Sequence, residues 1–85
     1  MLTPAWPNPF REVTKFELTV ASTQDVSVAA YDLNGRKVQV IYSGRLQPDL
    51  PMQLRFDSAG LASGVYVVRV DGERFAATEN VVVVK

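Results

Sequence analysis

Two residue types with broad chemical uses are missing from this chain. It contains neither cysteine nor histidine among its 85 residues. Without cysteine, a disulfide framework and a thiolate metal site are excluded. Without histidine, the usual general base near neutral pH is missing. With both absent, a Ser–His–Asp or Cys–His arrangement and an ordinary zinc site are impossible.

Acidic side chains are the remaining candidates for acid–base catalysis, because a pair of carboxylates can act as acid and base in glycosidases. The carboxylates here lie mainly at expected strand ends and turns: Asp25, Asp32, Asp49, Asp57, Asp71 and Glu73. A domain of this size has no deep pocket in which the pKa of a carboxyl group would be raised. We therefore predict that the chain is not an enzyme and uses no cofactor and no metal.

No charge of one sign dominates the chain. Nine basic and nine acidic side chains give a net charge of zero, whereas a nucleic-acid binder normally carries a basic stripe that neutralises phosphates. No apolar run approaches the ~20 residues of a membrane-spanning helix. Met1–Phe10 also lacks the basic and apolar regions of a signal peptide. These features predict no nucleic-acid partner, no membrane insertion and no export address at this N-terminus.

What the chain does contain is a repeated alternation of apolar and polar residues. A period of two is typical of half-buried strands, and Phe16, Leu18 and Val20 illustrate it. The pattern predicts seven short strands, at about residues 6–10, 14–21, 26–32, 37–43, 53–57, 65–70 and 74–84. Asn34-Gly35 and Asp71-Gly72 are the hairpin signals. The predicted fold is all-β: one immunoglobulin-like antiparallel β-sandwich of about seven short strands, spanning residues 1–85.

A tyrosine at an expected sheet corner has a structural explanation. Leu61-Ala62-Ser63-Gly64-Val65-Tyr66 places a turn glycine and a tyrosine at the start of a strand. In immunoglobulin-like sandwiches, a tyrosine near such a corner returns its hydroxyl to upstream backbone. We predict this structural role for Tyr66 in preference to ligand contact.

The aromatic residues and the scaffold leave two other functions open. Flat aromatic rings stack on sugars, so Trp6 and the three tyrosines raise the hypothesis of an accessory carbohydrate-binding module. The structural alternative is that Trp6 and Phe10, in a proline-bracketed segment, cover a sheet edge. A purely structural spacer between other domains is the remaining hypothesis.

The last predicted strand carries a continuous apolar run, Val81-Val82-Val83-Val84. One interpretation is a central strand buried on both faces. The other is a segment that another protein reads by strand addition, with Lys85 as a charged gatekeeper against aggregation. Both interpretations can hold at different stages of the protein's life.

Four motifs in a fixed order make the chain similar to a known family. They are Pro7-Asn8-Pro9-Phe10, Tyr31-Asp32-Leu33-Asn34-Gly35-Arg36-Lys37-Val38, Leu61-Ala62-Ser63-Gly64-Val65-Tyr66 and a closing Val83-Val84-Lys85. The ordered set resembles the type A C-terminal sorting domain of type IX secretion system cargo, known from Bacteroidetes-like bacteria. The resemblance covers nearly the whole chain.

The resemblance implies a fold and a function. The fold would be a seven-stranded immunoglobulin-like sandwich behind a larger exported protein. As a secretion signal it would direct a covalently linked N-terminal cargo domain from the periplasm across the outer membrane by the type IX secretion machinery. A sortase-like protease would then remove the domain, and the cargo would be secreted or kept at the cell surface. The positions matching the family's recognition motifs are Gly64, Tyr66, Val83, Val84 and Lys85.

Overall fold

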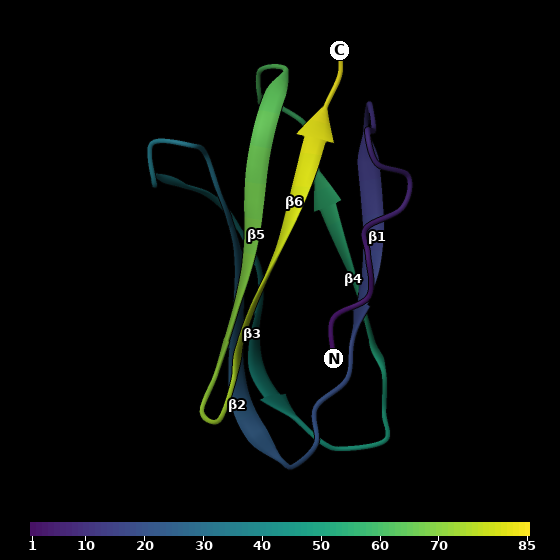
Figure 1. Ribbon diagram of the computed structural model, residues 1–85, viewed down its shortest axis with the longest axis vertical. Coiled ribbons are helices and arrows are strands. Elements are labelled where there is room, and N and C mark those ends of the chain that lie inside the picture. Colours follow the sequence, from purple (N-terminus) through teal and green to yellow (C-terminus); the bar gives the residue numbers. More distant parts are fainter.

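Six strands in two antiparallel sheets make up the fold (Figure 1). The structure is a computed structural model that describes all of residues 1–85. The strands are β1 (Val13–Leu18), β2 (Gln24–Tyr31), β3 (Lys37–Leu46), β4 (Met52–Asp57), β5 (Gly64–Gly72) and β6 (Ala76–Val83). One sheet has the order β1-β4 and the other β3-β2-β5-β6. The prediction of an all-β antiparallel sandwich is confirmed, and no helix long and apolar enough to cross a membrane is present.

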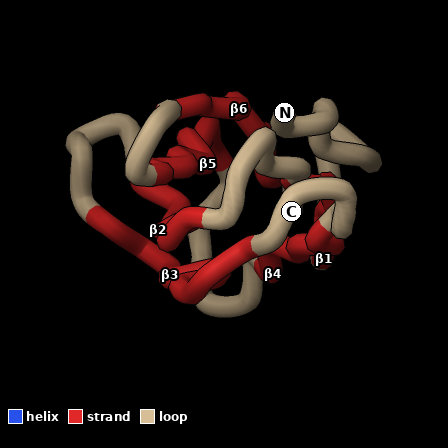
Figure 2. The backbone as a smooth tube through the Cα atoms, turned by 90° about the horizontal axis from the view of Figure 1, so that it is seen from below, coloured by secondary structure: helices blue, strands red, loops and turns tan.

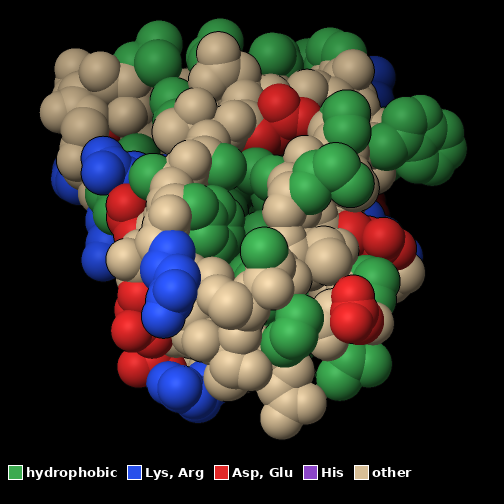
Figure 3. Space-filling view, turned by 60° about the horizontal axis from the view of Figure 1, so that its bottom comes forward, with side chains coloured by type: hydrophobic (Ala, Val, Ile, Leu, Met, Phe, Trp, Pro, Cys, Tyr) green, Lys and Arg blue, Asp and Glu red, His purple; other side chains and the backbone are tan.

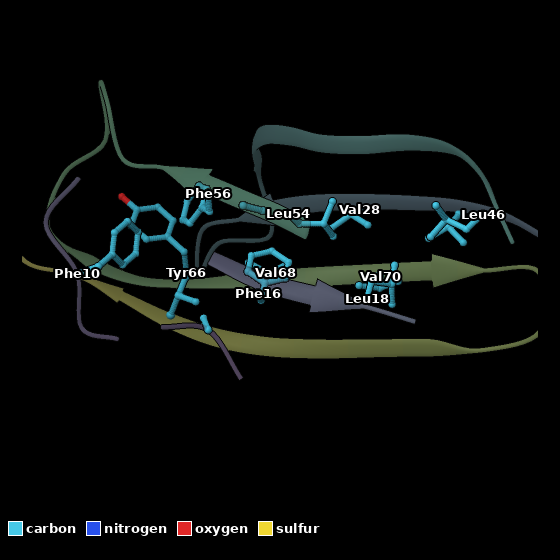
Figure 4. Close-up of a cluster of buried hydrophobic side chains, with 14 of the residues drawn as sticks. Phe10, Phe16, Leu18, Val28, Leu46, Leu54, Phe56, Tyr66, Val68 and Val70 are labelled. Carbon is cyan, nitrogen blue, oxygen red and sulfur yellow. The ribbon is translucent and has the colours of Figure 1, made fainter. Parts of the chain in front are cut away.

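Alternation along the strands builds the core between the sheets. In β2 the side chains of Val26, Val28 and Ala30 are buried, and intervening residues face outward or are small. The same alternation operates in β4 and β5, so apolar side chains from both sheets meet in one cluster (Figure 4). Burying a large apolar side chain contributes about 1.5–3 kcal/mol. This cluster therefore supplies most of the force that holds the two sheets together.

The segment predicted as a seventh strand is not a regular strand. Instead the chain from Met1 to Phe10, here called the N-terminal strap, makes isolated bridges to both sheets. The bridges join Leu2 to Leu18, Trp6 to Lys15 and Phe10 to Val83. Proline has no N–H to donate, so a segment with prolines at positions 4, 7 and 9 cannot form a continuous ladder. The strap pairs first with β1 and then with β6. Figure 2 shows β1 and β4 lying beside the four-stranded sheet.

The hairpin predicted at Asn34-Gly35 is confirmed, with a loop of residues 32–36 between β2 and β3. Gly35 alone in this loop has a positive φ, 84°. The carboxylate of Asp32 accepts hydrogen bonds from the main-chain N–H groups of Asn34 and Arg36, both at 2.9 Å. The bond from Arg36 is the main reason that the pKa of Asp32 lies below its ordinary 3.8. The Asp32 carboxylate is therefore engaged in stabilising the turn.

The second hairpin turns two residues later than predicted. Asp71 is still paired with Ala76 across β5 and β6, and the turn is closed by the N–H of Gly72 donating to the carbonyl of Phe75 at 2.8 Å. Gly72 allows the Phe75 ring to pack closely against the main chain, because a Cβ atom at this position would lie 2.5 Å from that ring. Asp71-Gly72 is therefore the end of β5 and does not itself form the turn.

Candidate recognition site

The five residues predicted for recognition come together at one end of the sandwich. Gly64 at the start of β5 is paired with Val83 at the end of β6, and Tyr66 is paired with Val81. Lys85 lies against the connection before β5, where its main-chain N–H donates to Ser63 Oγ at 2.9 Å. We call residues 81–85 the C-terminal segment. In Figure 1 it ends beside the upper end of β5.

The C-terminal segment belongs to an edge strand. β6 is the outermost strand of the four-stranded sheet, so the interpretation as a central strand buried on both faces is wrong. Val81 and Val83 are buried at 0% and 1% exposure, whereas Val84 is 43% exposed. The four consecutive valines thus form an ordinary half-buried strand end, in which alternate side chains point to opposite faces. Its outward side chains are accessible to a partner.

Tyr66 has the structural role that was predicted for it. Its hydroxyl donates to the carbonyl of Ala62 at 2.7 Å, four residues upstream. The side chain is 7% exposed and its ring meets that of Phe56 edge-on, with centroids 6.0 Å apart. Phe10 also meets the Phe56 ring edge-on, with centroids 5.7 Å apart. These three rings form an aromatic cluster beneath the C-terminal segment (Figure 4).

Tyr66→Phe is expected to lower the free energy of unfolding by about 1 kcal/mol, the usual net value of one hydrogen bond. The ring contacts remain, and the carbonyl of exposed Ala62 can bind water instead. For a domain of this size, thermal denaturation should show a decrease of about 4–8 °C. A loss as large as that of a core truncation would contradict a role limited to the hydroxyl.

Lys85 is held in place by its side chain as well as by its main chain. Its ammonium Nζ donates to the carbonyl of Ser58 at 2.7 Å, on the loop that follows β4. The same side chain stays exposed to solvent. The C-terminal segment is therefore tied to three neighbours: β5, the Ser58 loop and the N-terminal strap.

Not all five predicted residues are accessible. Tyr66 and Val83 are buried, Gly64 is half-buried, and Val84 and Lys85 are exposed. Val84 also borders a shallow groove whose apolar walls include Pro7, Pro9, Phe10 and Val13.

Asn8 is the functional candidate whose role the sequence did not reveal. Its side-chain amide donates to the carbonyl of Asn80 and accepts from the N–H of Val82, each at 3.0 Å. The motif Pro7-Asn8-Pro9-Phe10 was the signal that singled it out. Only the structure shows that this motif touches the C-terminal segment, because the two lie more than 70 residues apart in the chain.

The remaining surface offers no comparable site. Trp6 was expected to cover a sheet edge, but only its main chain does so, by exchanging hydrogen bonds with Lys15 at 2.9 and 3.0 Å. The Trp6 ring is 78% exposed, whereas Phe10 is buried. On the face drawn in Figure 3, basic and acidic side chains lie beside one another. Arg45 and Asp25 also form an exposed ion pair, with Arg45 Nη1 3.1 Å from Asp25 Oδ1.

Comparison with known protein families identifies the chain. The profile of the family described as the secretion system C-terminal sorting domain matches residues 4–85. The chain belongs to this family. Such domains are C-terminal sorting signals of the type IX secretion system, and they are not a family of enzymes. Membership implies interaction with the type IX machinery and secretion across the outer membrane to the cell surface or the surrounding medium.

A solved structure supports the fold. The crystal structure of dimeric latent PorU from Porphyromonas gingivalis matches this chain with a TM-score of 0.58 and 22% sequence identity. The match covers 94% of this chain and 9% of the PorU chain, so the sorting domain corresponds to a small part of that protein's length. No curated protein matches the chain.

Proposed function

We propose that residues 1–85 form the sorting domain of a larger exported protein, with a cargo domain joined on the N-terminal side. The type IX outer-membrane machinery would read the C-terminal segment. The observation that carries this proposal is the way the segment is presented. Hydrogen bonds to three neighbours hold it at a sheet edge while the side chains of Val84 and Lys85 stay exposed to solvent.

In this proposal the five recognition residues divide into two groups. Val84 and Lys85 are exposed and Gly64 is half-buried, so these three would contact the machinery directly. Tyr66 and Val83 are buried beneath them and would fix their positions by packing. The groove beside Val84 would accept apolar groups of the partner, and the ammonium of Lys85 would supply the charged contact.

A sortase-like protease is proposed as a second partner, which would separate the domain from its cargo after passage from the periplasm. The released or surface-attached product would be the cargo. The domain itself would contribute no catalysis, which agrees with the use of its carboxylates in structural bonds. Asp57, for example, accepts the main-chain N–H of Ala59 at 2.8 Å, and Asp32 closes its turn. Solitary exposed rings such as Trp6 are common on protein surfaces and carry no separate proposal.

A fusion experiment tests the function. A fluorescent protein with a Sec signal is placed ahead of residues 1–85 and expressed in a bacterium with type IX secretion. Most of the fluorescence is expected outside the outer membrane, and it should stay in the periplasm of a matched strain whose type IX system is disabled. Periplasmic retention in the competent strain, while an authentic cargo is exported, would refute the proposed function.

A further inference from the structure

The outer edge of β6 near its end is covered by the N-terminal strap. Three residues of β6 and the C-terminal segment direct four main-chain groups toward it: the carbonyl of Asn80, the N–H and carbonyl of Val82, and the N–H of Val84. The Asn8 amide bonds the first two at 3.0 Å each. The main chain of Phe10 bonds the other two, at 2.9 Å each. All four edge groups are therefore paired with the strap.

The side chain of Asn8 takes the place of a neighbouring strand at the β6 edge. Its neighbours Pro7 and Pro9 have no N–H, so the backbone there cannot donate to a sheet edge. A primary amide carries an N–H donor next to a C=O acceptor, which is the pattern that a strand presents. The strap is anchored on both sides of Asn8, by the carbonyl of Pro7 accepting from Thr14 Oγ1 at 2.7 Å and by the buried ring of Phe10.

We infer that Asn8 is a positioning residue of the export signal. Its amide holds the β6 edge, and with it the C-terminal segment, in the orientation in which Val84 and Lys85 are read. This inference rests on the function proposed above. The strap would lie next to the cargo junction. The export signal is therefore composite: the residues that the machinery reads and the strap that positions them come from opposite ends of the chain and are brought together by the fold.

Amide hydrogen exchange tests directly whether the Asn8 amide holds the β6 edge. In Asn8→Ala, the Val82 amide loses its only acceptor and should exchange about fivefold to tenfold faster, the equivalent of one net hydrogen bond. Val82 and Val84 donate to the strap, so the amides of Val81 and Val83 point the opposite way, toward β5, and serve as internal controls. Their exchange should stay unchanged. An unaltered Val82 amide, or equal acceleration at all four valines, would overturn the inference.

A matched control variant changes Asn80, the residue whose carbonyl accepts the hydrogen bond from Asn8. Asn80→Ala removes an exposed side chain but keeps the carbonyl that Asn8 contacts, so exchange at Val82 should equal that of the unaltered domain. Acceleration as large as in Asn8→Ala would overturn the role of the Asn8 amide.

The fluorescent fusion supplies the second readout. Asn8→Ala should reduce export by up to about fivefold, the factor by which the loss of one hydrogen bond lowers the equilibrium constant between the held and the released segment. Asn34→Ala, the same substitution in the exposed β2–β3 turn, should leave export unchanged. Undiminished export of Asn8→Ala beside faster Val82 exchange would overturn the positioning role. Failure of the unaltered fusion would instead refute the proposed function, and the exchange data would still decide whether Asn8 holds the edge.

Discussion

Replacing both Val84 and Lys85 by serine is expected to abolish export of the fused cargo while the domain stays folded. Both side chains are exposed, and their main-chain bonds to Phe10 and Ser63 do not depend on the side chains. Only the bond from the Lys85 ammonium to the Ser58 carbonyl is lost, at a cost of about 1 kcal/mol. Export should fall by more than about tenfold, as expected when central contacts of an interface are removed. Cell fractionation measures export, and urea denaturation measures stability.

Val83→Ala is the matched control for this prediction. Val83 is adjacent in sequence but 1% exposed, so its truncation should cost about 2 kcal/mol of stability. The outward side chains remain, and export should fall only as far as the folded population falls. If export followed stability in the same way in both variants, the C-terminal segment would act through packing and would not be read.

The second large effect is expected in the aromatic cluster. Phe56→Ala should lower the free energy of unfolding by about 3–5 kcal/mol, because it leaves a cavity in the core. Phe56 is fully buried and meets Phe10 and Tyr66 edge-on. These contacts add about 0.5–1.5 kcal/mol each beyond area burial. The whole free energy of unfolding of a small domain is only about 5–15 kcal/mol. Thermal denaturation of the variant should therefore begin at a much lower temperature than that of the unaltered domain, and export should decline with the folded fraction.

Phe75→Ala provides a control with the same change in chemistry. Phe75 is half-buried at the β5–β6 turn, packed against Gly72 and away from the aromatic cluster. Its truncation should cost less than half as much stability as Phe56→Ala. Equal losses at the two positions would contradict the central place given to Phe56.

Local features were predictable because they depend on near neighbours in the chain. A period of two decides which face of a strand is apolar, and so Phe16 and Leu18 were placed correctly in the core. Asn34-Gly35 tolerates the turn conformation wherever it occurs. The hydroxyl of Tyr66 needs an acceptor only four residues away.

The Asp71-Gly72 signal shows the limit of such local evidence. The pair is compatible with a tight turn, but the ladder between β5 and β6 extends past it, and the turn forms at the next two residues. Pairing over the whole length of two strands outweighs the preference of one dipeptide, because each added pair buries and bonds further groups.

Composition and strand pattern indicated a β-sandwich that lacks cysteine and histidine, and the ordered motifs indicated the sorting family. Tertiary structure decided where the C-terminal segment lies and what holds it. Four valines in a row suit a central strand or an edge strand equally well, since both bury at least one face. Only the order of strands in the sheet places β6 at an edge. Only the crossing of the strap brings the amide of Asn8 to that edge, because the contact depends on residues at opposite ends of the chain.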